Sequence, residues 1–241
     1  MNKILEDFDG YYSKALKVFE GRSINVDVTH RCLLQCPFCS RQSAAHGKLM
    51  IKKSHAYGDL KLEHARNLGN TYSRLTLCGQ ISDPIYHTNF IEIFKELIKT
   101  NCKNIEIHTT GSHKKIEFWK KLYEAADQRE KNIEVVFGID GIDEKSSIHR
   151  VNQNTNDAFE AMFLGAEYSK NNPNLKITWQ YIPFAFNEND LPKAIEICKE
   201  KGIKFLLLKS GRFSGENDFL QPPKNKDLYN VRAFTERINI D

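Results

Sequence analysis

Six stretches of the sequence either alternate apolar and polar residues or are short apolar runs, and most are separated by segments with helical spacing. Alternation with a period of two is the pattern of a β-strand, because successive side chains point to opposite faces. The strands predicted in this way cover residues 23–29, 75–77, 105–108, 133–139, 176–182 and 205–208.

Between these strands, apolar residues recur every three or four positions, as on one face of a helix. We expect Gly69 to close the first helix, Asn156 to cap the start of the fourth and Gly202 to cap the end of the fifth. Alternation of strand and helix favours an α/β fold in which helices cover a parallel sheet. The predicted helices cover residues 60–68, 90–98, 116–126, 159–166 and 191–198.

We expect one α/β domain at residues 23–212, after a helical lead-in at 1–22 and before an irregular tail at 213–241 with a helix near 229–237. A chain of 241 residues can bury a full core. Its composition, 40% hydrophobic and 27% charged, is usual for a soluble globular protein. The formal net charge of +4 is too small to indicate a nucleic-acid partner.

No apolar run reaches the ~18 residues of a membrane helix, and the first residues lack the apolar core of a signal peptide. We therefore expect a cytoplasmic protein with no membrane partner. In that reducing compartment, clustered cysteines indicate a metal site or catalysis rather than disulfides. Cys198 lies on the apolar face of a predicted helix, where it is expected to be a small core residue.

Polar motifs follow each of the six predicted strands. In parallel α/β folds the carboxyl ends of the strands lie at one edge, where ligands bind. The motifs are therefore expected to form one shared site rather than six independent turns. They occupy residues 32–39, 78–84, 109–112, 140–141, 182–184 and 209–212.

The first of these motifs is rich in cysteine. Cys32, Cys36 and Cys39 have the spacing C-x3-C-x2-C, with Phe38 before the last of them. Clustered thiolates suit an iron–sulfur cluster or zinc, but both a structural zinc site and a standard four-iron cluster take four ligands. Three thiolates on a four-iron cluster leave one iron open to a small molecule. A zinc module completed by a histidine, such as His30, and a non-enzymatic iron–sulfur electron carrier or sensor stay open as alternatives; His46 is a second candidate for the zinc module.

This cysteine motif resembles that of the radical S-adenosylmethionine (AdoMet) superfamily, C-x3-C-x-aromatic-C. The resemblance covers roughly residues 23–212, most of the chain, and implies a partial (β/α)6 barrel of parallel strands, similar to part of a TIM barrel. It also implies that Cys32, Cys36 and Cys39 hold a [4Fe–4S] cluster. The amino and carboxylate groups of AdoMet would chelate the open iron.

Later motifs are similar to those of one branch of the superfamily, related to the peptide-modifying SPASM group. Residues 79–84 read GQISDP, which resembles a GNYGDP variant of the second motif, and residues 138–141 read GIDG, which resembles SIDG. His149-Arg150 stands where that branch has Tyr-Arg. The extra cysteines that the branch uses for auxiliary clusters do not occur after Cys198. The resemblance implies AdoMet contacts from Phe38, Gly79, Gln80, Asp83, Thr110, Ser112, Asp140, Arg150, Gln180 and Ile182.

Three of these residues have specific implied roles. Ser112 would hydrogen-bond the ribose or carboxylate of AdoMet, and Arg150 would hold the carboxylate as a planar fork. Ile182 would line the adenosyl pocket beside Gln180. From the residues alone, Arg150 could equally form a surface ion pair, Asp140 could be a cap or turn residue, and Ile182 could belong to the core.

The resemblance also implies a reaction and its partners. An external one-electron reductant of the flavodoxin or ferredoxin type would reduce the cluster. AdoMet would then be cleaved to a 5′-deoxyadenosyl radical, which takes hydrogen from a substrate. A peptide is the first expectation for that substrate. The alternatives are a nucleotide or other small metabolite, and a partner protein on which a glycyl radical is formed.

Overall fold

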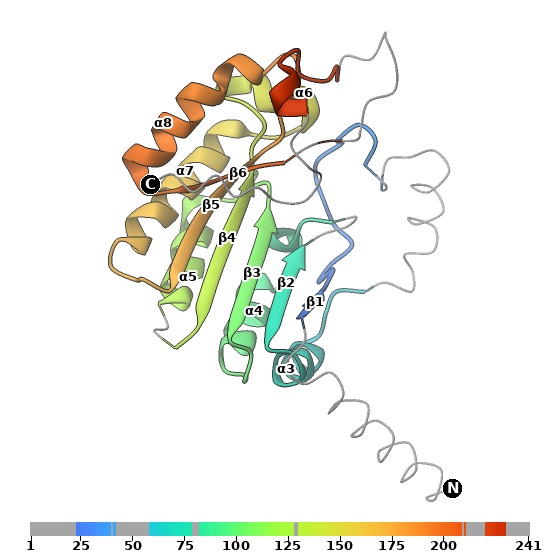
Figure 1. The fold of residues 1–241 in the computed structure, drawn as a ribbon. Helices are drawn as coiled ribbons and strands as arrows, with labels where there is room; N and C mark the ends of the chain where they lie inside the picture. The colour runs from blue at the N-terminus through green and yellow to red at the C-terminus, as the bar shows by residue number, and fades with distance from the viewer. Residues whose placement is uncertain are drawn as a thin grey trace, which may run out of the picture.

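The computed structural model describes residues 23–39, 41, 58–78, 82–127, 130–208, 210 and 220–229. Six strands form one parallel sheet in the order in which they occur in the chain (Figure 1). The predicted α/β fold with six parallel strands is therefore confirmed, and its open, sequential sheet is consistent with a partial barrel. The strands are β1 (Ser23–Asn25), β2 (Arg74–Cys78), β3 (Asn104–Thr109), β4 (Asn132–Gly138), β5 (Leu175–Tyr181) and β6 (Lys204–Leu207).

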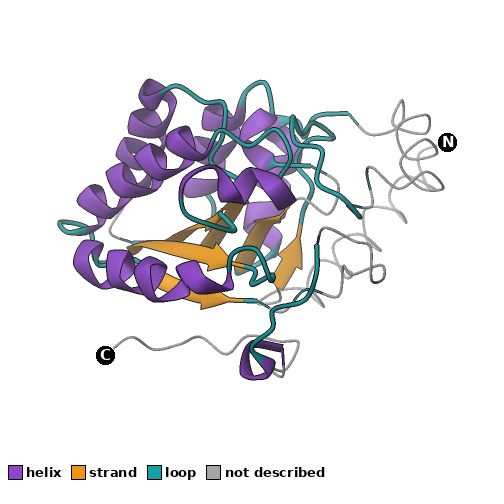
Figure 2. Cartoon of the chain, turned by 90° about the horizontal axis from the view of Figure 1, so that it is seen from above, coloured by secondary structure: helices purple, strands orange, loops and turns teal. Residues whose placement is uncertain are grey.

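The longer helices lie together on one face of this sheet (Figures 1 and 2). No helix in the described part of the chain is long and apolar enough to cross a membrane. The five longer helices are α3 (Leu62–Thr71), α4 (Phe90–Ile98), α5 (Ile116–Ala126), α7 (Thr155–Ser169) and α8 (Leu191–Lys201). The short elements are α6 (Ser146–His149), α9 (Lys226–Tyr229) and the 3-10 turns η2 (Pro84–Tyr86), η3 (Asp143–Lys145) and η4 (Glu188–Asp190).

Alternate residues of each strand face the helices. The ring of Trp179 in β5 lies 5.1 Å from that of Phe159 in α7, and Phe137 in β4 lies 5.3 Å from Trp119 in α5. Burial of these aromatic rings is a large apolar contribution to stability. The intervening residues of each strand point to the opposite face of the sheet. On that face, five of the six strands carry polar side chains, such as Glu106 in β3.

The predicted helix ends are right in one case and wrong in two. Gly202 ends α8 in the left-handed conformation, with φ of 68°. By contrast, α3 continues through Gly69 to Thr71. The cap of α7 is Asn154 rather than Asn156, because the Asn154 side chain accepts a hydrogen bond from the Asp157 N–H.

Several predicted segments lie outside the described residues. They are the lead-in at 1–22, most of the polar loop after the cysteines at 42–57, and the end of the tail at 230–241. Within the tail, α9 begins at Lys226, three residues before the predicted helix. Cys198 is fully buried in α8, as expected, and Cys102 is also buried.

Gly69 is needed for packing rather than for a helix end. A β-carbon at this position would lie 2.2 Å from Oγ1 of Thr100. That hydroxyl is held in place by its 2.6 Å hydrogen bond to the Leu97 carbonyl. The glycine therefore permits close contact between α3 and the segment that follows α4.

Gly69→Ala is predicted to destabilise the fold by ~1–3 kcal/mol, because overpacking outweighs the better helix propensity of alanine. The measurement is the free energy of unfolding in denaturant. Asn67→Ala, at an exposed position of the same helix, is the matched control and should change stability by less than ~0.5 kcal/mol. A Gly69→Ala protein as stable as the parent would contradict this account.

Candidate functional site

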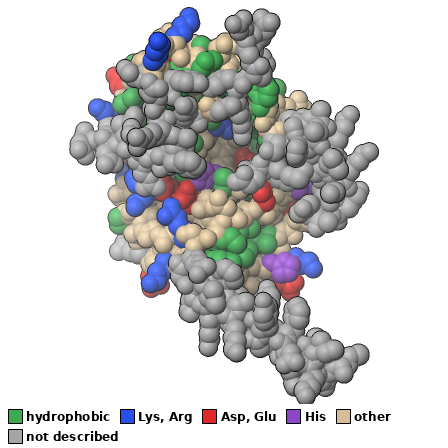
Figure 3. Space-filling view, turned by 45° about the vertical axis from the view of Figure 1, so that its right-hand side comes forward, with side chains coloured by type: hydrophobic (Ala, Val, Ile, Leu, Met, Phe, Trp, Pro, Cys, Tyr) green, Lys and Arg blue, Asp and Glu red, His purple; other side chains and the backbone are tan. Residues whose placement is uncertain are grey.

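A cavity of about 360 Å³ opens at the carboxyl edge of the sheet. It lies on the side of the molecule that is hollowed in Figure 3. Segments that follow all six strands contribute to its wall, so the predicted shared site at this edge exists. The lining residues are Cys32, Leu34, Cys36, Cys39, Arg41, Cys78, Ser82, Asp83, His108, Thr109, Thr110, Val136, Gly138, His149, Arg150, Gln180, Ile182, Leu208 and Ser210.

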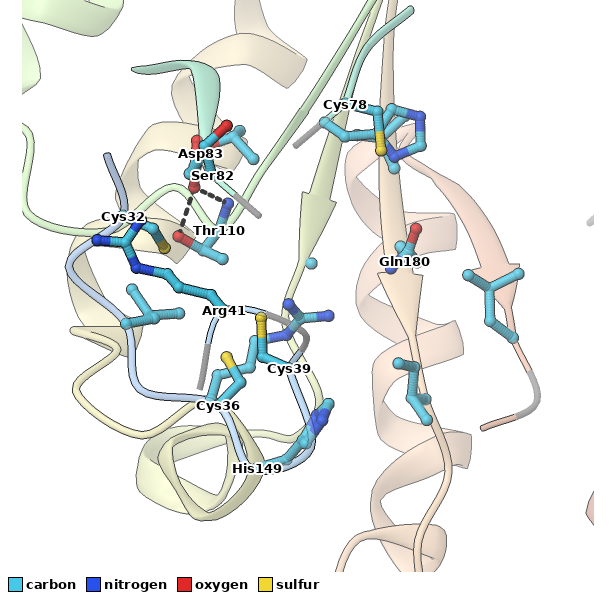
Figure 4. A pocket seen from close by; sticks show the side chains of 18 of the residues that line it. Cys32, Cys36, Cys39, Arg41, Cys78, Ser82, Asp83, Thr110, His149 and Gln180 are labelled. Carbon is cyan, nitrogen blue, oxygen red and sulfur yellow. Dashed lines mark hydrogen bonds between the residues drawn. The ribbon is translucent and has the colours of Figure 1, made fainter. Parts of the chain in front are cut away.

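The cysteine loop runs from β1 along one wall of this cavity (Figure 4). It ends in a turn in which the Cys39 N–H donates to the Cys36 carbonyl at 3.2 Å. Phe38 makes this turn possible by adopting a left-handed backbone with φ of 58°. Phe38 is 47% exposed and is not among the residues that line the cavity, so its implied contact with AdoMet stays a prediction.

Two hydrogen bonds join the cysteine loop to the segment after α6. The Gln35 N–H donates to the Val151 carbonyl at 2.9 Å, and the Asn152 side chain donates to the Leu33 carbonyl at 2.8 Å. The ends of β1 and β4 are therefore coupled, although more than a hundred residues separate them in sequence. Cys36 and Arg150 line the same cavity, and the negative charge of a Cys36 thiolate would raise the pKa of the Arg150 guanidinium.

The donor set of this loop fits a multi-iron cluster. No three His, Cys, Asp or Glu side chains in the described part of the chain converge as the ligands of a single metal ion would. In a four-iron cluster, however, each cysteine binds a different iron. The relevant observation is that Cys32, Cys36 and Cys39 are partly buried, form no disulfide in the described part of the chain and all line one cavity. Burial raises the pKa of Cys32 to about 12, so a cluster would have to displace its proton.

Asp83 joins the loops after β1, β2 and β3. Its Oδ2 accepts hydrogen bonds from the Thr110 N–H and hydroxyl, both at 2.8 Å, and from the Thr109 hydroxyl at 3.1 Å. Its own N–H donates to the Arg31 carbonyl at 3.0 Å, just before the first cysteine. Burial raises the pKa of Asp83, against the lowering effect of these hydrogen bonds. Asp83 therefore lines the cavity while its carboxylate organises three loops.

Asp140 has a similar role at the ends of β4 and β5. Its buried carboxylate accepts a 2.7 Å hydrogen bond from Nδ1 of His149 and a 2.9 Å hydrogen bond from the Ile182 N–H. Its Oδ2 lies 2.8 Å from Nε of Arg150. Burial alone would raise the pKa of Asp140, but the Arg150 charge and the His149 hydrogen bond lower it. The carboxylate lies behind the cavity wall, and its partners His149 and Arg150 form part of that wall.

Gly138 explains how the Arg150 guanidinium fits between the strand and the cavity. A β-carbon at this position would lie 2.7 Å from Nη2 of Arg150. Arg150 is therefore not a surface residue, and its guanidinium is not unpaired. It pairs with the buried Asp140 carboxylate and also reaches the cavity. The ion pair is therefore buried rather than at the surface, and the contact of Arg150 with AdoMet stays a prediction.

The other predicted site residues divide into three groups. Thr110, Gln180 and Ile182 line the cavity, as expected. Ser112 is fully buried behind the wall, where its hydroxyl accepts a 2.6 Å hydrogen bond from the Asn154 N–H. Gly79 and Gln80 lie outside the described residues.

Sequence analysis gave no individual role to two cavity residues on the inner face of the sheet, Cys78 and His108. Cys78 and His108 are paired in the register of β2 and β3, and both line the cavity. His108 is oriented by Glu106, which also accepts a 2.6 Å hydrogen bond from Arg74. Alternation within β3 was the available signal, because Glu106 and His108 share the face opposite the buried Ile105 and Ile107.

Arg150→Ala is predicted to lower the free energy of unfolding by ~3 kcal/mol, because the buried Asp140 carboxylate loses its guanidinium partner. Adding Asp140→Asn in the same chain removes the buried charge and should recover part of that loss. Denaturant unfolding measures both effects. The control is Arg66→Ala, which breaks a pair with Glu96 in which the arginine is 58% exposed, and should cost less than ~1 kcal/mol. If the double variant loses as much stability as the two single variants together, the proposed coupling between Arg150 and Asp140 is contradicted.

The three cysteines, Asp83 and the inner-face His108 line one cavity although they come from elements far apart in the chain. No protein-family model matches the chain, and no curated protein matches it either.

Proposed function

We propose that the protein is a radical AdoMet enzyme. The observation that carries this proposal is that the three cysteines of the C-x3-C-x2-C motif border a single cavity to which every strand end of the sheet contributes. Spacing alone would suit several kinds of metal site. The shared cavity adds space for a second ligand beside the cluster, as an enzyme of this class requires.

Cys32, Cys36 and Cys39 would hold a [4Fe–4S] cluster in the proposed enzyme. With three protein ligands, one iron is open to the amino and carboxylate groups of AdoMet. When bound and reduced, the cluster supplies an electron that cleaves AdoMet to methionine and a 5′-deoxyadenosyl radical. That electron would come from an external flavodoxin- or ferredoxin-type donor.

The chain itself would bind and orient AdoMet and exclude water. Thr110, Gln180 and Ile182 come from three different strand ends and give the wall both polar and apolar surface. A cavity of about 360 Å³ is within the usual size range of small-molecule sites. A reactive intermediate also needs a site that excludes water, because side reactions with water must be avoided.

The proposed substrate is a peptide, on the resemblance of residues 138–141 to the peptide-modifying branch. The sheet has six strands in an open order, so β1 and β6 are not paired with each other. An open side of this kind would admit a large or extended substrate. A nucleotide or other small metabolite is the second candidate, favoured by the modest volume of the cavity.

One prediction from the proposed function concerns the cluster. Anaerobic reconstitution should give about four irons per chain, the content of one [4Fe–4S] cluster. Replacing Cys32, Cys36 or Cys39 by Ala should abolish it. Cys102→Ala should retain it, because that thiol is buried against the backbone carbonyls of Ser73 and Asn104. Iron and sulfide analysis decides the point, and about eight irons per chain, the sum for two such clusters, would refute it.

Another prediction from the proposed function concerns the cleavage of AdoMet. The reconstituted, reduced protein should convert AdoMet slowly to 5′-deoxyadenosine and methionine even without substrate, measured by mass spectrometry. The Cys36→Ala protein, treated identically, is the control and should give no 5′-deoxyadenosine. A parent protein that carries the cluster but forms no 5′-deoxyadenosine would overturn the proposed function.

A further inference from the structure

A second hollow, a groove of about 400 Å³, lies between the amino-terminal halves of α4 and α5. These helices belong to the layer that covers one face of the sheet (Figure 1). Phe90 and Phe118, whose ring centroids are 6.3 Å apart, give the groove apolar surface. Three lysines also line it, Lys95, Lys114 and Lys121. The groove shares no lining residue with the cavity that contains the cysteines.

The groove carries an excess of positive charge. None of its three lysines forms an ion pair with a described residue. Among the described residues that line the groove, Glu92 is the one acidic side chain. His87 is neutral, because Nδ1 accepts a 2.9 Å hydrogen bond from the Asn89 N–H while Nε2 donates to the Leu60 carbonyl at 2.9 Å. Three positive charges therefore face one negative charge, and the groove suits an anionic partner.

Lys114 is the most firmly positioned of these lysines. Its Nζ lies 4.9 Å from the ring centroid of Phe118 and 5.7 Å from that of Tyr86. Cation–π contacts of this kind hold an ammonium group in place. Partial burial lowers the pKa of Lys114. The rings leave its N–H groups to donate to a carboxylate, so the contacts prepare the ammonium group for an acidic partner.

Tyr86 connects this groove with the proposed cluster. Its ring contacts Lys114 on the side of the groove, and its hydroxyl donates to the Ser112 carbonyl at 2.9 Å. Burial raises the pKa of Tyr86, and the negative charges of Asp83 and Cys32 add to this effect. The phenol is therefore within electrostatic range of the first proposed cluster ligand.

Two backbone hydrogen bonds follow the same route. The Tyr86 N–H donates to the Asp83 carbonyl at 3.1 Å, and the Asp83 N–H donates to the Arg31 carbonyl at 3.0 Å. Arg31 directly precedes Cys32, which lies close to Asp83 in Figure 4. An electron that arrives at the groove therefore has a path of covalent bonds and two hydrogen bonds to a cluster ligand. The donor loses one electron and the cluster gains it, and no proton has to move.

We infer that the groove between α4 and α5 is the docking site of the one-electron donor protein, whose acidic surface pairs with the three lysines. The inference rests on the proposed function, because only a cluster-bearing chain needs such a donor. Donor proteins of the flavodoxin and ferredoxin type carry acidic surfaces, and electron-transfer complexes are small and guided by charge. A substrate has to enter the cavity to react, whereas an electron crosses protein. The separation of groove and cavity therefore favours a donor over an acidic substrate.

The rate of cluster reduction tests the inference. Stopped-flow mixing of the reconstituted protein with reduced flavodoxin measures this rate. Lys95→Glu combined with Lys121→Glu should lower it about tenfold or more, because electrostatic steering raises association rates by that much or more. Lys120→Glu is the matched control for Lys121→Glu alone, since Lys120 is exposed on α5 but does not line the groove. At a salt concentration that screens charges beyond ~8 Å, only Lys121→Glu should slow the reaction.

Two further measurements complete the test. Reduced methyl viologen, a small cation that needs no docking site, should reduce the cluster at the same rate in the parent and in every variant. Carbodiimide cross-linking joins lysine amines directly to carboxylates. With the parent protein and oxidised flavodoxin, peptide mass spectrometry should find cross-links at the three groove lysines and not at Lys120. This measurement needs neither electron transfer nor a variant that folds.

Several outcomes would overturn the inference. Equal rates for Lys121→Glu and Lys120→Glu with flavodoxin, or cross-links confined to other lysines, would overturn it while leaving the proposed function intact. If Lys121→Glu slows viologen-driven formation of 5′-deoxyadenosine but not reduction by flavodoxin, the groove serves AdoMet or the substrate instead. If the parent protein assembles no cluster, both the inference and the proposed function fail.

Discussion

The arrangement of the site depends on a buried charge. Asp140 is fully buried at the end of β4, and its carboxylate is stable there only because Arg150, His149 and the Ile182 N–H surround it. These partners come from the segment after β4 and from the end of β5. One carboxylate thus holds two strand ends and α6 in a single arrangement, and that arrangement determines which atoms face the cavity.

Asp83 organises the ends of β2 and β3 in the same way as Asp140 organises the ends of β4 and β5. Its three hydrogen bonds to Thr109 and Thr110 join the ends of β2 and β3, and its N–H reaches the cysteine loop. The Gln35–Val151 hydrogen bond then connects the two halves. The cavity wall is therefore a network of polar contacts at the edge of an apolar sheet.

Local sequence patterns were enough to predict the helices and strands of this fold. They did not predict which residues from different elements come into contact. Alternation in β3 identified a strand and its apolar face, since Ile105 and Ile107 are buried by the helices. It did not reveal that His108 on the other face reaches a cavity, because that depends on the loops after the neighbouring strands. Gly69 was misread for a similar reason: its role is set by Thr100, thirty-one residues away, and not by its own helix.

What the sequence by itself determined is the α/β class, the number and direction of the strands and the clustering of the three thiols, because these follow from local periodicity and spacing. Only the tertiary structure decided that Arg150 is paired with Asp140, that Ser112 is turned away from the cavity and that His149 is left with an unpaired nitrogen. The physical reason is that a buried polar group is defined by its partners. Those partners come from different strand ends, and their proximity is a property of the assembled sheet.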